Sequence, residues 1–483
     1  MLENFTIESL IQGYKDKKFS VSEVVSDYYE RIAKVNPDYN VYVSLCRDLA
    51  EQRVSNMSEY NIDKHLLYGV PLGLKDLFSY KGSELTAASK ILKGFKPSYN
   101  AVSTQRILDH GGIVLGMVNT DQFACGASNE TSAYGPVNNP YNREYVSGGS
   151  SGGSASLIPL NLGVFATGTD TGGSIRQPAS FCNAVGLKPT YGRIPRAGVI
   201  PMASSLDTVG HLTKTVMDSA IVLQAMAGTH KHDSTSPDVP VDDYKSYVHK
   251  GVKGMKIGIP KEYFTDFNDP EVTKQVMKSI DVLKSQGAEI VEISLPYTKY
   301  GVAVYYIVSP CELSANMERY DGVRYGNFTK DDVNNLFEYY TKTRGQGLGE
   351  EILRRIMVGT FCLSSESYEA YYLKAQKVRT LLIEDFKNAF KQVDLIAGPV
   401  SPTPAFKLNS KANNPLEMYQ CDALTIPSNC AGIPGISVPA GFTNSGLPVG
   451  LQLLAPHFSE GKLFSAAQVV ENEFKYFSQV PSL

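Results

Sequence analysis

Residues 148–154 read Gly-Gly-Ser-Ser-Gly-Gly-Ser, and residues 168–178 read Gly-Thr-Asp-Thr-Gly-Gly-Ser-Ile-Arg-Gln-Pro. A glycine–serine run on its own is usually a flexible linker. Here, however, the stretch between the two runs, Ala155–Val164, is largely apolar, which is not typical of a linker's neighbour. The pattern predicts two loops that bracket a helix and a strand and together form one site.

The second run could supply an oxyanion hole. Glycines allow successive backbone N–H groups to turn towards one point because no Cβ blocks the approach. Such donors contribute about 2.7–4 kcal/mol each to acyl transfer. If Ser174 begins a helix, the candidate donors are the N–H groups of Thr171, Gly172, Gly173 and Ser174. Without its context, Ser174 would be interpreted as an ordinary N-cap serine.

Two other sites use similar glycines. A phosphate-binding loop is disfavoured because the pattern GxxxxGK[ST] is absent. Gly148–Gly152 fits the GxSxG pattern of Ser-His-Asp hydrolases, but residues 138–144 before it are predicted to form a loop, where that motif needs a strand. The seven histidines lie in no recognisable active-site motif. The Ser-His-Asp interpretation is therefore the weaker alternative.

Lys75 is the candidate base. It ends the apolar segment Tyr68-Gly-Val-Pro-Leu-Gly-Leu-Lys75 and so could close a buried strand. Most lysines are solvated and charged. Burial would lower the pKa of this amine from about 10.4 towards about 7, which would let it accept a proton.

Composition limits the class of protein. The chain has 483 residues, 42% hydrophobic and 20% charged, and a formal net charge of -3, so any contact with RNA would be local or made by a partner. Seven scattered cysteines form no CxxC pair, which argues against structural zinc and a disulfide framework. The sequence shows no signal peptide and no apolar span of membrane length. We expect a cytoplasmic protein without a membrane contact; a mitochondrial location stays open.

Helical and strand patterns alternate along the chain, which favours an α/β fold. A capping box at Ser20–Glu23 predicts a helix start. Near the C-terminus, two apolar segments flank the turn Thr443–Gly446 and predict a hairpin, so the sheet should be mixed. Further elements are predicted as a strand at 255–260, a helix from Asp269 to Gly287, a strand at 289–295, a helix at 368–393 and a strand at 394–397.

Together, the segments around Lys75, Ser150 and Ser174 resemble the amidase-signature family almost from end to end. The resemblance implies a mixed sheet with helices on both faces. It also implies a Ser–cis-Ser–Lys triad, in which Lys75 takes a proton from Ser150 while Ser150 takes one from Ser174. Lys75 lies in the GVPxGxKD motif, Ser150 in GGSSGGS after a cis peptide, and Ser174 in GTDTGGSIRQP.

Four further segments are similar to the glutaminase subunits of tRNA-dependent amidotransferases in this family; they are 314–325, 343–349, 353–365 and 368–372. The resemblance implies hydrolysis of glutamine to glutamate and ammonia, within a heterotrimer with GatB-like and GatC-like subunits. The GatB-like partner would use ATP and Mg²⁺ to amidate Glu-tRNA(Gln) or Asp-tRNA(Asn), and would make most of the tRNA contact. This chain itself would need no cofactor or metal.

The resemblance also implies the substrate contacts. Arg355 would bind the α-carboxylate of glutamine, with Arg354 as its rival, and Asp422 would bind the α-amine. The remaining residues expected to line the pocket are Gly126, Ser128 and Tyr306, with Tyr305 as the rival of Tyr306. A stand-alone amidase for small carboxamides is the alternative, and it would not need the charged pair. An inactive assembly subunit is disfavoured by the intact triad.

One domain is expected over residues 1–483. Its parts are N-terminal helices at about 1–60, a catalytic core at about 61–230 with C-terminal strands at about 394–483, and a substrate-covering insertion at about 297–393. Three positions depart from the family pattern: Gln122 replaces an acidic residue, Cys125 a methionine, and His211 a proline. None is in the triad, and His211 is expected to be structural.

Overall fold

The two glycine–serine segments lie at the middle of an 11-stranded sheet in the computed structural model, which describes residues 4–412 and 414–481. The sheet combines parallel and antiparallel pairs, as predicted. From edge to edge its strands are β1 (Tyr42–Leu45), β3 (Ile113–Val118), β2 (Pro71–Lys75), β6 (Phe165–Asp170), β8 (Thr208–Thr213), β7 (Val185–Lys188), β12 (Gly435–Phe442), β13 (Pro448–Leu454), β11 (Leu395–Pro399), β9 (Lys256–Pro260) and β10 (Glu289–Ile293).

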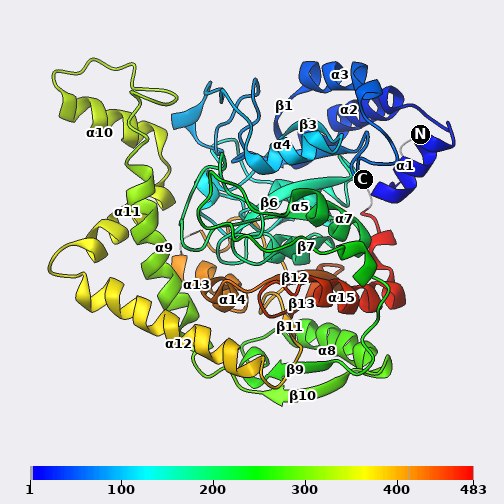
Figure 1. Cartoon of the computed structure of the whole chain (residues 1–483). Helices are drawn as coiled ribbons and strands as arrows, with labels where there is room; N and C mark the ends of the chain where they lie inside the picture. Colours follow the sequence, from blue (N-terminus) through cyan, green and yellow to red (C-terminus); the bar gives the residue numbers. More distant parts are fainter. Residues whose placement is uncertain (1–3, 413, 482–483) are drawn as a thin grey trace.

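Helices flank this sheet on both sides (Figure 1), which confirms the predicted α/β class. Figure 1 shows α9, α11 and α12 on the left of the strands, and α7 and α15 on the right. The helices are α1 (Ile7–Lys15), α2 (Val21–Tyr39), α3 (Arg47–Ser55), α4 (Val102–Asp109), α5 (Gly152–Leu157), α6 (Arg176–Phe181), α7 (Val216–Met226), α8 (Pro270–Ser285), α9 (Gly301–Met317), α10 (Leu336–Gly347), α11 (Glu350–Leu363), α12 (Lys374–Ala389), α13 (Pro415–Tyr419), α14 (Ile426–Ala431) and α15 (Glu460–Phe474).

Local sequence signals place several of these elements. Ser20 caps α2 through the predicted capping box with Glu23. Asp269 caps α8, whose first residue is Pro270. The predicted hairpin is β12 and β13, paired antiparallel around the turn. Within residues 4–412 and 414–481, no helix is both long and apolar enough to cross a bilayer.

The prediction of a loop at residues 138–144 was wrong. These residues form part of a two-stranded ribbon, β4 (Asn138–Asn139) and β5 (Asn142–Val146). The side chain of Asn139 donates to the carbonyls of Val146 and Phe181, and the N–H of Val146 donates to Phe406. Contacts with distant parts of the chain therefore create these strands, and local propensity could not show them.

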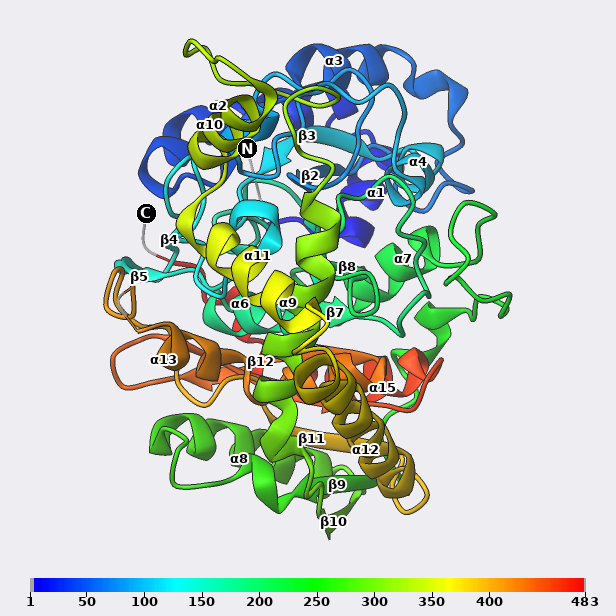
Figure 2. The same cartoon turned by 90° about the vertical axis from the view of Figure 1, so that its left-hand side faces the viewer.

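The helices α9 to α12 stand apart from the sheet, and Figure 2 shows α9 and α11 crossing in front of it. The two helices approach closely because Gly359 of α11 lies against the backbone of Pro310 in α9, where a Cβ would come within 2.0 Å of the carbonyl oxygen. These helices lie within the predicted insertion. The domain boundaries drawn from the sequence stay predictions.

A buried ion pair lies within the second glycine–serine segment, and its arginine also links that segment to the C-terminal part of the chain. Arg176 Nη2 and Asp170 Oδ1 are 2.9 Å apart, and both side chains are fully buried. Arg176 also donates to Ser428, Gln452 and Asn429. Burial alone would raise the pKa of Asp170, but Arg176 lowers it to about 2. The carboxylate is therefore charged and held by its partner.

Arg176→Met should lower the free energy of unfolding by about 3–5 kcal/mol, because it leaves the Asp170 carboxylate buried without its counter-charge. Arg47→Met is the control, since the Arg47–Glu51 pair is exposed and should contribute about 1 kcal/mol or less. Chemical denaturation of both variants measures the difference. Equal, small losses would contradict the importance of the buried pair.

Candidate active site

The amine of Lys75 lies at the end of β2 and is fully buried. It donates to three hydroxyls: Ser150 at 2.8 Å, Ser151 at 2.9 Å and Thr169 at 2.9 Å. Burial lowers the pKa of Lys75 to about 7, although the nearby Asp121 carboxyl acts in the opposite direction. The lowered pKa favours the neutral amine, which can accept a proton from a hydroxyl.

The backbone before Ser150 is held by Asp121. The peptide bond between Gly149 and Ser150 is cis, as the family resemblance implied. The Ser150 carbonyl accepts from Asp121 N and from the Thr120 hydroxyl. A Cβ on Gly149 would lie 2.1 Å from the Asp121 carboxyl, and one on Gly126 would lie 2.3 Å from it. Only glycine fits at these two positions.

Ser174 lies beside the same hydroxyls. Its carbonyl accepts from the N–H of Ser151 at 3.1 Å, so the two glycine–serine segments are directly joined. The side chain is buried, with 5% of its surface exposed. In the part of the chain that the structure describes, its hydroxyl makes no hydrogen bond with Ser150 or Lys75. The structure thus joins the Ser174 backbone to the residue that follows Ser150, and the hydroxyl relay from Ser174 to Ser150 stays a prediction.

The predicted oxyanion-hole segment has free donors. Among the described residues, the N–H groups of Gly172, Gly173 and Ser174 have no hydrogen-bond acceptor. Gly173 has a φ of +141°, and a Cβ there would lie 2.2 Å from the Thr425 hydroxyl oxygen. That hydroxyl donates to the Gly172 carbonyl at 2.6 Å, which orients the loop. The segment can therefore offer N–H groups to a developing negative charge.

A cavity of about 290 Å³ is walled in part by α11 and α13, and neither the triad nor residues 171–174 line it. Four of the residues predicted to bind substrate line it: Gly126, Ser128, Tyr306 and Arg355.

Asp422 does not line this cavity but lies next to the nucleophile loop, 3.1 Å from the position of a Cβ on Gly173. Its Oδ1 is buried and has no partner among the described residues. Burial and the neighbouring Asp170 raise its pKa well above the usual range. An incoming ammonium group would stabilise the charged carboxylate.

The members of the two rival pairs differ in their surroundings, although Arg354 and Arg355 both line the cavity. Arg355 is buried against α9, whereas the Arg354 side chain is 44% exposed at the rim. The ring of Tyr306 stacks on that of Tyr419 with centroids 3.6 Å apart, and lines the cavity. Tyr305 instead lies against the loop, where its ring would be about 3 Å from a Cβ on Gly172. Tyr305 thus covers the nucleophile loop and Tyr306 faces the cavity.

Several residues at the site were not predicted. Ser151 and Thr169 hold the lysine amine. Gln177 joins the two predicted loops, because it donates to the Ala127 carbonyl and accepts from the N–H of Gly149. All three lie inside or beside the segments quoted first, so their neighbourhood was visible in the sequence but their partners were not.

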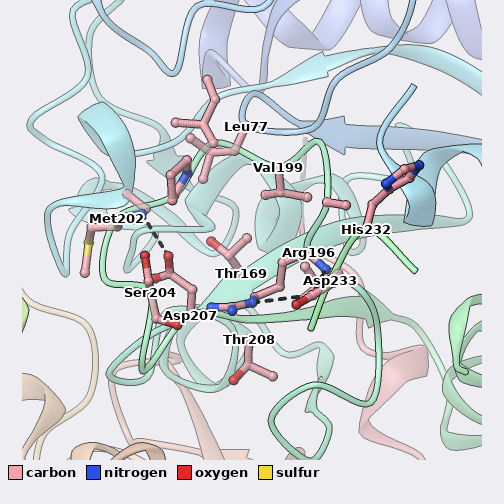
Figure 3. A pocket seen from close by; sticks show the side chains of 15 residues that line it. Leu77, Thr169, Arg196, Val199, Met202, Ser204, Asp207, Thr208, His232 and Asp233 are labelled. Atoms are coloured by element: carbon pink, nitrogen blue, oxygen red, sulfur yellow. Dashed lines mark hydrogen bonds and ion pairs between the residues drawn. The ribbon is translucent and has the colours of Figure 1, made fainter. Parts of the chain in front are cut away.

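A second cavity, of about 200 Å³, extends to Thr169, whose hydroxyl accepts from the Lys75 amine (Figure 3). Thr169 lines it, as do Asp207, Arg196 and Asp233. Asp207 accepts from the Thr171 hydroxyl at 2.8 Å, so this wall is continuous with the oxyanion loop. None of the predicted substrate-binding residues lies here.

No histidine takes part in this arrangement. Within the described residues, none of the seven forms a hydrogen bond with Ser150 or Ser174. His211 is fully buried and its Nε2 lies 2.8 Å from the Ser219 hydroxyl, a structural contact as expected. Burial lowers its pKa to about 3. The Ser-His-Asp alternative has no support in the geometry.

Comparison with known proteins gives a consistent answer. A family model described as Amidase matches residues 23–464. The A-type subunit of glutamyl-tRNA(Gln) amidotransferase from Geobacter sp. (strain M21) is 48% identical over 98% of both chains. The corresponding protein from Halothermothrix orenii is 46% identical over the full length of both.

Among solved structures, the A-type subunit of glutamyl-tRNA(Gln) amidotransferase from Thermotoga maritima superposes with a TM-score of 0.81 at 35% identity, covering 98% of this chain and 96% of that one. A 6-aminohexanoate cyclic dimer hydrolase, 22% identical with a TM-score of 0.87 and covering 100% and 99% of the two chains, shares the fold. The chain belongs to the amidase family.

Proposed function

We propose that this chain is the glutaminase subunit of a tRNA-dependent amidotransferase. The observation that carries the proposal is a basic group in the cavity together with an acidic group beside the nucleophile loop. A buried guanidinium, Arg355, lines the cavity, and an unpartnered buried carboxyl, Asp422, adjoins Gly173. The α-carboxylate and α-amine of glutamine match these two groups. The full-length similarity to subunits of glutamyl-tRNA(Gln) amidotransferases supports the same conclusion.

The mechanism follows from the hydroxyl chain at Lys75. The neutral amine takes the Ser150 proton while Ser150 takes the Ser174 proton, and the Ser174 oxygen attacks the carboxamide carbon. The N–H groups of residues 171–174 stabilise the negative oxygen that forms. The proton then returns through Ser150 to the leaving nitrogen, and ammonia departs. Water, activated by the same chain, hydrolyses the acyl-enzyme to glutamate.

The ammonia is the useful product in this proposal. GatB-like and GatC-like subunits would complete a heterotrimer in the cytoplasm. The GatB-like subunit would bind ATP, Mg²⁺ and most of the tRNA, and would use the ammonia to convert Glu-tRNA(Gln) or Asp-tRNA(Asn). A stand-alone amidase is the competing function, and Arg355 and Asp422 would then have no evident ligand.

Ser174→Ala should abolish glutamine hydrolysis while the assembled complex still amidates tRNA from added ammonium, because only the nucleophile is lost. Co-purified partner subunits, assayed with glutamine and with ammonium salts, give both measurements. Full glutaminase activity in the variant would refute the nucleophile. A wild-type chain that purifies alone and supports no tRNA amidation would favour the stand-alone amidase.

The rate should depend on pH through Lys75, whose pKa is lowered to about 7 by burial. The neutral amine is the active form, so kcat/KM for glutamine should rise about tenfold per pH unit below pH 7 and level off above it. Lys75→Ala should remove most activity. Single substitution of each of the seven histidines should preserve the rising limb; a histidine variant as inactive as Ser174→Ala would restore the Ser-His-Asp alternative.

Arg355→Lys should raise the KM for glutamine about a hundredfold, because an ammonium cannot reproduce the bidentate contact with a carboxylate. Arg354→Lys is the matched control on the next residue and should change KM less than about threefold, since its side chain lies at the rim. Steady-state kinetics on both variants decides between them. The reverse order would assign the substrate contact to Arg354.

A further inference from the structure

The carboxylate of Glu351 lies at the centre of the charged groups in the substrate cavity. Its Oε1 accepts from Arg355 Nε at 2.7 Å and from the Tyr419 hydroxyl at 3.2 Å. Its other oxygen, Oε2, pairs with Arg354. The side chain is 14% exposed, and it lines the same cavity as Arg355. The mechanism proposed above gives this acidic group no role.

The contact with Glu351 uses only one edge of the Arg355 guanidinium. Among the described residues, the hydrogen bonds of this side chain are confined to its Nε. The two terminal nitrogens are left for a ligand. The rings of Tyr306 and Tyr419 lie 5.2 and 5.8 Å from the guanidinium carbon and limit its movement. The group is thus held at its Nε edge and lies beside the stacked pair of rings, and its two terminal nitrogens are free among the described residues.

An acidic side chain beside a site for a carboxylate would ordinarily repel the substrate. Here two guanidiniums flank one carboxylate, so the cluster of Arg354, Arg355 and Glu351 keeps a net charge of two minus one, or +1. The other charged residues that line the cavity are Lys411, Glu130 and Glu350, so its three basic and three acidic side chains balance formally. Glu351 therefore weakens the attraction of the site for the substrate carboxylate. Its favourable contribution is to the orientation of the Arg355 guanidinium.

We propose that Glu351 is a positioning residue, which fixes the Arg355 guanidinium so that its terminal nitrogens meet the α-carboxylate of the substrate. Arg354 and the Tyr419 hydroxyl hold Glu351 in turn. This inference rests on the proposed function, because it takes glutamine as the substrate. It also gives Arg354 a place behind the substrate contact.

The test compares two amides in the full chain with its co-purified partners. Glutamine carries the α-carboxylate, whereas 4-aminobutyramide has the same amine and carboxamide without it. Glu351→Gln keeps the size of the side chain but removes the charge that aligns Arg355. The KM for glutamine should rise about tenfold with little change in kcat. The kcat/KM for 4-aminobutyramide should stay within about twofold, because that substrate has no group for Arg355 to bind.

Glu51→Gln is the matched control. The Arg47–Glu51 pair on α3 has the same i,i+4 spacing and the same Nε to Oε1 contact, at 3.0 Å, but it lies on the surface. It should change neither substrate.

Three outcomes would count against the inference. Equal losses of Glu351→Gln on both substrates would make Glu351 a general structural residue, and an unchanged KM for glutamine would remove its positioning role. Both results leave the proposed function intact, provided that wild type prefers glutamine. A wild-type chain without that preference would instead refute the proposed function, and with it the carboxylate contact on which the inference rests.

Discussion

The arrangement of this molecule depends on one buried amine. Placing Lys75 at the end of β2 removes it from water, and the loss of solvation favours its neutral form. Three hydroxyls replace the lost water, from Ser150, Ser151 and Thr169. Because these hydroxyls carry no charge, they satisfy the amine without raising its pKa as a carboxylate partner would. A proton acceptor at neutral pH follows from this choice of partners.

Glycines allow the loops around the Lys75 amine to pack closely against neighbouring polar groups. Gly149 and Gly126 leave room for the Asp121 carboxyl, and Gly173 leaves room for Thr425. Each of these neighbours orients a loop by accepting or donating hydrogen bonds. The loops are therefore fixed by buried polar groups, which is the opposite of a flexible linker of similar composition.

Lys75 and Ser174 could be proposed from the sequence because each lies in a short segment of unusual composition: a lysine that closes an apolar run, and a glycine–serine loop beside an apolar stretch. Ser150 was assigned only through the family resemblance, and the catalytic roles of all three stay predictions. The sequence was not sufficient for β4 and β5, which depend on Phe181 and Phe406 far along the chain. The sequence held enough information to predict which of Arg354 and Arg355 faces inward. The inward face of α11 is Ile352, Arg355, Gly359 and Cys362, a helical period that places Arg355 inside. Helical spacing also places Arg354 and Arg355 within reach of Glu351. The contact of Glu351 with Tyr419 could not be predicted, because Tyr419 lies on another element.

The unpaired polar groups of Arg355 in the cavity and of Asp422 beside the nucleophile loop define which amides the site can favour. Asp422 has a buried oxygen without a partner, and the Arg355 fork has no acceptor, among the described residues. An amide with neither an amine nor a carboxylate would bury both groups unsatisfied, and each such group costs about 1–3 kcal/mol, more if charged. Glutamine offsets both costs at once. The site therefore selects glutamine mainly because other amides leave its buried polar groups unpaired, and less because it attracts glutamine strongly. The same argument applies to the empty site: burial raises the pKa of Asp422, and a nearby ammonium group would act in the opposite direction.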